Sequence, residues 1–298
     1  MPIPRALIAF LLCSAAARAA DPQPVIARPM TLPRGAIDVT LHGTYTNWDG
    51  SLLGLNSALT GETIALGLDF GATDQVQLGV GVALPINPGA GFGSVLATAA
   101  FAANPVLAIR VDAGYESFGA NGDNTTGLSH TNRYFGGLGV PLKAPITPTV
   151  AVVSGRNGAV HFGHFNNIGQ NGTGLYFGAT AFTELGSDVF VLSTGNNDSG
   201  SILGINLPFG LLLQPDPVIA LTLLAGYSAR VSLPSSGSSQ TLHFLPVGLE
   251  AVVTPSPALD IGLRFSIDGY VAQSGGSSAG APGYFDMRAL MLWLRLHA

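Results

Sequence analysis

The sequence predicts an all-β fold, a single closed antiparallel transmembrane β-barrel of about 14 strands, with 12 as the alternative count. Three observations lead to this prediction. Only 10% of the 298 residues are charged and 47% are hydrophobic, whereas about a quarter of residues in a water-soluble domain are usually charged. Segments of alternating polarity are long enough to cross a bilayer. The connections between them are alternately short and long, as in outer-membrane-type barrels.

The first 19 residues have the pattern of a secretory signal peptide. Arg5 supplies the positive start, residues 6–17 the apolar core, and residues 17–19 a small-x-small cleavage site. A permanent helical anchor is the weaker alternative because the apolar run is too short to span a bilayer. A lipoprotein site at Cys13 is disfavoured by the bulky residue before it. We therefore expect export and cleavage after residue 19.

The mature chain has a composition that excludes several classes of protein. Removal of the signal peptide leaves 10 basic and 17 acidic residues, a net charge of −7, no cysteine and a single lysine, Lys143. Nucleic-acid binding has no electrostatic basis in such a chain, and disulfides cannot stabilise it. No later stretch approaches 18 uninterrupted apolar residues, so no transmembrane helix is predicted. A closed barrel fits, because it pairs every backbone group between strands without a continuous apolar run.

Residues 20–35 form a proline-rich lead that is unsuited to a central strand. We expect this lead on the periplasmic side, where it either hangs free or enters the barrel mouth. Residues 36–298 are predicted to form the barrel. An inward-folded lead or the long loops could plug the lumen, because 14 strands enclose a width between a filled barrel and an aqueous channel.

The clearest strand is residues 258–271. Alternate positions are apolar from Leu259 to Val271, and the positions between them include Asp260, Arg264 and Asp268. Period two indicates a strand, and its length exceeds the usual five or six residues. The other predicted strands are 36–47, 61–70, 74–84, 94–102, 106–116, 130–141, 148–156, 173–183, 188–195, 200–213, 217–230, 240–253 and 284–296.

The connections support the same count. Short turns rich in Gly, Pro, Asp and Ser are expected at 71–74, 103–105, 143–148, 184–187, 214–216 and 254–257. Longer connections are expected at 49–61, 86–93, 117–130, 155–172, 232–240 and 273–283, and 195–200 is the one connection that should be long and is short. A soluble sandwich, the competing fold, gives no reason for this alternation. Aromatic residues near strand ends suit a membrane-interface girdle, namely Tyr45, Trp48, Tyr115, Phe118, Tyr227, Tyr270 and Tyr284.

Charged and polar side chains on the less apolar parity are predicted to line the pore. They are Asp38, His42, Arg110, Asp112, Glu116, Glu250, Asp260, Arg264, Asp268 and Arg295. A charge facing lipid near the midplane would cost several kcal/mol. Inward charges could form a mixed-charge pore lining or cross-strand ion pairs in a filled barrel, and both roles stay open. Arg110, Asp112, Arg264 and Asp268 are expected at mid-lumen, and Arg295 is expected to pair with Asp38 where the barrel closes.

The stretch RPMTLPRGAIDVTL (28–41) resembles the start of porin-like barrels related to the outer-membrane proteins of aromatic-degradation meta-pathway clusters. The general pattern of a Gram-negative outer-membrane β-barrel covers nearly all of the mature chain. This resemblance implies a cell outer-membrane location and a passive channel for small molecules, apolar ones among them. It also implies outer-membrane lipid, small solutes and the barrel-assembly machinery as partners. Such barrels usually end in an aromatic residue, whereas this chain ends in Ala298; either the assembly signal is degenerate or the last strand lies elsewhere.

Alternative functions find little support in the residues. A lipid-acting outer-membrane hydrolase would need a Ser–His pair, and His161 or His164 beside a loop serine is the place for it. However, GYSAR (226–230) lacks the second glycine of a nucleophile elbow. The HFGH pair (161–164) is predicted to be a solvated loop rather than a metal site. No catalytic residue, metal or cofactor is expected, and a structural or adhesive barrel is the remaining alternative.

Overall fold

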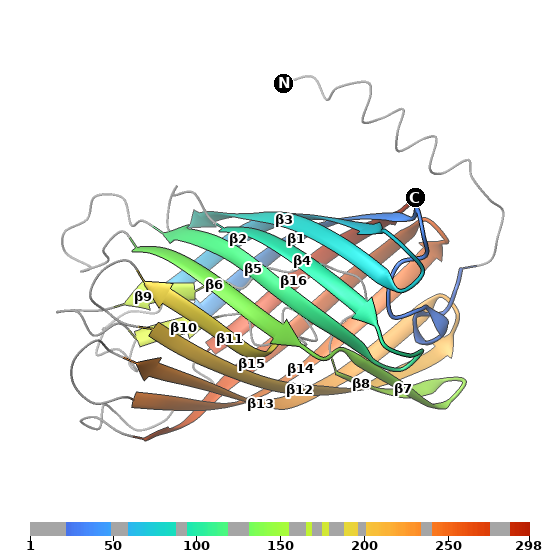
Figure 1. Ribbon diagram of the computed structural model, residues 1–298. Helices are drawn as coiled ribbons and strands as arrows, with labels where there is room; N and C mark the ends of the chain where they lie inside the picture. Colours follow the sequence, from blue (N-terminus) through green and yellow to red (C-terminus); the bar gives the residue numbers. More distant parts are fainter. Residues whose placement is uncertain are drawn as a thin grey trace.

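The computed structural model describes residues 22–48, 59–87, 94–118, 131–154, 165–168, 175–178, 188–195, 201–233, 240–274 and 287–298. These residues form a barrel of tilted antiparallel strands with the N-terminal lead at one end (Figure 1). Within them, no helix is both long and apolar enough to cross a membrane.

The described strands are mostly long. The short 3-10 helix η1 (Val25–Ala27) precedes β1 (Ile37–Trp48), β2 (Leu59–Gly71), β3 (Val76–Asn87), β4 (Ser94–Ala102), β5 (Ala108–Phe118), β6 (Thr131–Gly139), β7 (Leu142–Thr147), β8 (Val150–Ser154), β9 (Phe165–Ile168), β10 (Leu175–Gly178), β11 (Asp188–Gly195), β12 (Ser201–Asp216), β13 (Ile219–Leu233), β14 (Gln240–Ser256), β15 (Leu259–Ser274) and β16 (Met287–His297). The last strand therefore lies where the sequence predicts it, so a misplaced C-terminal strand does not explain the non-aromatic end.

The wall has 12 strand positions. Strands β1 to β5 and β12 to β16 supply ten of them, each paired with its sequence neighbour, and β1 pairs with β16. The eleventh position contains β6 and then β7, which follow one another down the wall with Pro141 between them. The twelfth contains β8 and β11, because β8 pairs with β7 and β12, while β11 pairs with β6 and β12. The pairings thus run around a nearly closed antiparallel barrel.

The prediction of 14 strands is wrong and the alternative of 12 is right. The predicted strands 148–156 and 188–195 share one wall position. Neither is long enough to cross a bilayer alone, because β8 has five residues and β11 has eight, whereas a spanning strand needs about 9–11. Of the predicted strand 173–183, residues 175–178 form β10, which pairs with β9 in a separate two-stranded sheet. Alternation of polarity within a segment does not show whether that segment has a wall position to itself.

The two ends of the barrel differ. Short turns at 72–75, 103–107, 148–149, 217–218 and 257–258 lie at one end, which we call the turn end, together with the lead and the C-terminus (Figure 1). The predicted turns 71–74, 103–105, 214–216 and 254–257 correspond to these positions within a few residues. The predicted turn 143–148 is wrong, because Leu142–Thr147 form β7 and the turn follows at 148–149. Residues 184–187 and most of the predicted long connections lie outside the described residues. We call the opposite end the loop end.

The two faces of the wall have opposite chemistry. Large apolar side chains on one face are between 37% and 64% exposed, as in β15, where Ile261, Leu263 and Phe265 point away from the interior. Between them, Asp260, Arg264 and Ser266 are buried on the other face. An outward apolar band of this extent is unfavourable in water and matches the hydrocarbon of a bilayer. Of the predicted girdle, Tyr45 is exposed on this band.

Candidate functional site

The sequence-predicted pore-lining side chains are buried in the barrel interior wherever they are described. Asp38, His42, Arg110, Asp112, Glu250, Asp260, Arg264 and Arg295 are each at most 6% exposed. The side chains of Glu116 and Asp268 lie outside the described part of the chain. The period-two pattern therefore places the described charges on the inward face. The structure brings most of them together in two networks, one at the turn end and one deeper in the barrel.

The first network joins the strands on either side of the closing seam. His297 Nδ1 lies 2.7 Å from Asp38 Oδ1 on β1, and its Nε2 lies 2.9 Å from Asp260 Oδ2 on β15. Arg295 Nε lies 4.0 Å from Asp38 Oδ2, which confirms the pairing expected at closure. The backbone closes as well, because Ile37 and Ala298 exchange two hydrogen bonds of 2.8 Å.

The second network surrounds Trp293. Arg264 Nη2 lies 3.1 Å from Glu250 Oε1, and Trp293 Nε1–H donates to the same carboxylate at 3.0 Å. The Trp293 ring lies against Gly262, where a Cβ atom would come within 1.9 Å of the indole. The guanidinium of Arg295 stands over the ring, 5.3 Å from its centroid, within cation–π range. On β5, Arg110 Nε donates to Asp112 Oδ2 at 2.9 Å.

The described part of the lead, residues 22–35, crosses the turn end of the lumen. The Arg28 guanidinium donates to Asp260 Oδ1 at 2.8 Å and, through Nη1, to Oδ2 on β15. The carbonyl of the same residue accepts a hydrogen bond from Lys143 Nζ on β7. These two strands are five positions apart in a ring of 12. A single residue of the lead therefore bridges nearly opposite sides of the barrel.

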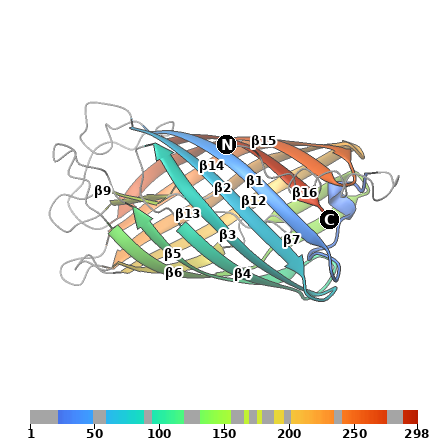
Figure 2. The ribbon, with the colours of Figure 1, turned by 90° about the horizontal axis from the view of Figure 1, so that it is seen from above.

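A second pair of contacts crosses the mouth in another direction. The backbone N–H of Ile26 donates to Gln214 Oε1 on β12 at 3.2 Å, and that of Leu32 donates to Gln77 Oε1 on β3 at 3.0 Å. These strands are also five wall positions apart. Seen from above, the lead lies at the end of the barrel beside the short turns (Figure 2). Of the two sequence expectations, entry into the mouth is the one that the structure shows.

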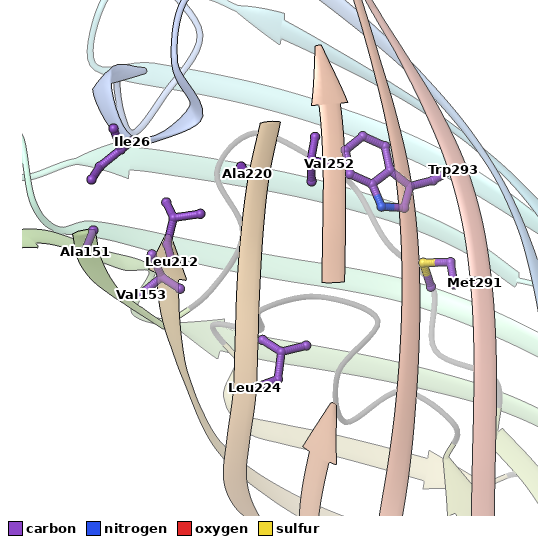
Figure 3. Close-up of a cluster of buried hydrophobic side chains, with 9 residues drawn as sticks. All are labelled: Ile26, Ala151, Val153, Leu212, Ala220, Leu224, Val252, Met291 and Trp293. Atoms are coloured by element: carbon purple, nitrogen blue, oxygen red, sulfur yellow. The ribbon is translucent and has the colours of Figure 1, made fainter. Parts of the chain in front are cut away.

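One side of the interior beside the lead is apolar. Ile26 of the lead belongs to a buried cluster with Ala151, Val153, Leu212, Ala220, Leu224, Val252, Met291 and Trp293. These side chains come from β8, β12, β13, β14 and β16 and point into the barrel (Figure 3). We call this cluster the apolar patch. The interior thus combines an apolar patch with two charged networks.

Sequence reasoning missed the residues that hold the lead. Gln77 lies on the polar parity of the predicted strand 74–84, but no local pattern marks Gln77, Arg28, Gln214 or His297 as a site residue. Lys143 is the only lysine of the chain, but it falls in the segment 143–148 that is predicted to be a turn, so its burial on β7 was not expected. The contacts of Arg28 join segments more than 100 residues apart, and no local pattern encodes them.

The described residues do not include the histidines on which the hydrolase alternative depends. His161 and His164 lie outside them, so the proposed Ser–His pair is not placed. Among the described side chains, no group of three His, Cys, Asp or Glu residues is arranged to hold a metal ion.

No protein-family model and no curated protein sequence matches the chain. Solved structures do match. The crystal structure of an outer membrane channel from Pseudomonas putida F1 is 13% identical, with a TM-score of 0.53, and the match covers 90% of this chain and 97% of that one. The NanC porin (6% identity, TM-score 0.44, 87% and 98% covered) and LpxR from Salmonella typhimurium (14%, 0.45, 86% and 99%) are less similar in shape. The chain thus has the fold of an outer-membrane β-barrel, as its resemblance to porin-like barrels implied.

Proposed function

We propose that the protein is a passive outer-membrane channel for small molecules whose periplasmic mouth is closed by its own lead. The observation that carries this proposal is the pair of bridges that the lead makes between nearly opposite strands, inside a barrel with an apolar exterior. Short turns face the periplasm in bacterial outer-membrane barrels, so the turn end and the lead are assigned to that side. Residues 1–19 would act as the cleaved signal peptide, and assembly machinery would insert the barrel.

The interior suggests the kind of solute. Buried charges such as Glu250 and Arg264 lie in the same lumen as the apolar patch. A small molecule with an apolar body and a polar end would meet a complementary surface for each part. We therefore propose small, partly apolar solutes, and we assign mixed-charge pore lining to the inward residues, including Glu116 and Asp268.

Single-channel conductance in planar bilayers tests the proposal. The variant Arg28→Ala removes hydrogen bonds to a charged group that contribute about 1.5–3 kcal/mol each. We expect the lead to be displaced from the mouth at least about tenfold more often. The frequency of channel openings should rise by the same factor. The control is Arg34→Ala, which removes the same charge from an exposed position of the lead and should behave like the wild-type chain.

Folding is verified by heat-modifiable migration on a denaturing gel. If all three chains are folded barrels and none, Arg28→Ala included, gives conductance or solute flux into liposomes, the channel proposal is rejected. A lipase activity lost in His164→Ala would instead support the hydrolase alternative.

A further inference from the structure

We infer that the turn-end mouth is a peptide-binding site in which the lead is an exchangeable ligand, and that its ligand class is a short peptide, bound with one 3-10 turn, that has an aliphatic residue two positions before an arginine. The site would accept such a peptide from a separate molecule on the periplasmic side. This inference concerns recognition and goes beyond the proposed channel function. It rests on how the wall holds the lead.

The wall recognises the backbone of the lead. Gln214 and Gln77 accept hydrogen bonds from the N–H groups of Ile26 and Leu32. Lys143 Nζ donates to the carbonyl of Val25 at 3.2 Å and to that of Arg28. All three wall side chains are at most 5% exposed. Contacts to backbone groups give affinity for a peptide whatever its side chains, and here they hold a segment that includes the 3-10 turn of η1.

The recognition groups are oriented by the wall itself. The amide nitrogen of Gln214 donates to the carbonyl of Asp216 at 2.9 Å, and that of Gln77 donates to Asp69 Oδ1 at 3.0 Å. Each amide oxygen is thereby directed toward the lead. Groups held in place before the ligand arrives lose little conformational freedom on binding. The two glutamines therefore form a preorganised binding site and do not depend on packing against side chains of the lead.

Two side-chain subsites add specificity. Asp260 is fully buried, accepts from Thr254 Oγ1 at 2.7 Å and lies 2.9 Å from His297 Nε2, so wall residues fix its position. The planar fork of Arg28 meets both of its oxygens, a geometry that lysine cannot reproduce. Two residues earlier, Ile26 is buried in the apolar patch. The selected pattern is therefore an aliphatic residue, any residue, and arginine.

The lead keeps its place partly because it is tethered. A segment joined to its site has an effective concentration of about millimolar for a short flexible connection, so a free peptide competes poorly with the intact lead. A chain whose own lead has lost both side-chain contacts should admit the peptide in trans. The double variant Ile26→Ser/Arg28→Ala provides such a chain.

The experiment measures the fluorescence anisotropy of a labelled synthetic peptide of residues 22–33 with the full-length chain folded in detergent. We expect saturable binding to the double variant and binding at least about tenfold weaker to the wild-type chain, because its tethered lead competes. Arg28→Lys in the peptide, or Asp260→Asn added to the double variant, should each weaken binding about tenfold or more. The single variant Arg28→Ala serves if the double variant does not fold.

Two outcomes would overturn the inference. One is the absence of saturable binding to a folded chain with a weakened lead. The other is binding that is indifferent to both Arg28 of the peptide and Asp260 of the wall. Anisotropy does not depend on conduction, so binding without any conductance would reject the channel and leave the peptide site. Conductance without binding would reject the peptide site alone.

Discussion

At the scale of single residues, the interior is governed by the pairing of buried charges. Glu250 and Arg264 are at most 3% exposed in their side chains and lie 3.1 Å apart. Desolvation of the two ions offsets much of their attraction, so such a pair adds little net stability. Removal of one partner is different, because the other charge then stays buried without compensation. Replacement of only one residue of this pair should therefore destabilise the protein.

The variant Glu250→Ala should therefore lower the free energy of unfolding by about 3–5 kcal/mol. It removes the acceptor of Trp293 as well as the counter-ion of Arg264. The double replacement Glu250→Leu/Arg264→Met is the control and should restore most of the stability, because it removes both charges. Urea unfolding in detergent, followed by tryptophan emission, measures both. Equal destabilisation of the single and double variants would contradict this account.

At the scale of elements, the lead is built as an attachment to the wall. It turns into β1 at Gly35, whose φ of 81° lies in the left-handed region that glycine adopts without penalty. Gly35 N–H donates to the carbonyl of Gly71 at 2.7 Å, and Gly71 N–H donates to that of Ala36 at 2.9 Å. A Cβ on Gly71 would lie 2.0 Å from the carbonyl oxygen of Pro33. The base of the lead thus lies against β2 backbone to backbone.

Gly71→Ala should push the base of the lead off β2. Overpacking of this kind costs about 1–3 kcal/mol, and we expect faster trypsin cleavage after Arg34 together with a lower unfolding midpoint. Gly43→Ala is the matched control, because a Cβ at that β1 position meets nothing within 4 Å. If both glycine variants are cleaved at the wild-type rate, the close approach of lead and wall is not what holds the lead.

At the scale of the whole molecule, the barrel separates two environments. Its exterior displays residues such as Leu263, and its interior buries Asp260 and Arg264 on the same strand. A closed wall is required for this separation, because an open sheet would leave an unpaired edge in lipid. The pairing of β1 with β16 completes it. Membrane insertion is therefore a property of the complete ring and not of any single strand.

A charge placed on the exterior should destabilise the protein according to its depth. Leu263→Arg, on the apolar band, should cost about 2–4 kcal/mol in lipid vesicles, and Ile146→Arg, close to the turn at 148–149, about 0–1 kcal/mol. Both positions are well exposed, at 50% and 64%. Urea unfolding from vesicles measures the difference. Equal and small costs at the two sites would indicate that the band does not face hydrocarbon.

Much of this architecture could be read from residue order because its causes are local. Side chains of a strand point alternately to its two faces, so alternation in segments such as 258–271 predicts both strand and orientation. The count of wall positions could not be read in the same way. The segments 148–156 and 188–195 each look like a strand, yet both contribute to one position, because their lengths and partners are set by neighbouring strands.

The sequence by itself determined that the chain forms a β-barrel and which side chains face inward, because a period of two residues and the cost of exposing charge to lipid act at every position independently. Only the tertiary structure decided that there are 12 wall positions, that His297 joins Asp38 to Asp260, and that Arg28 bridges β15 and β7 across the mouth. The physical reason is that these contacts join residues far apart in the chain, whose meeting depends on how the ring closes.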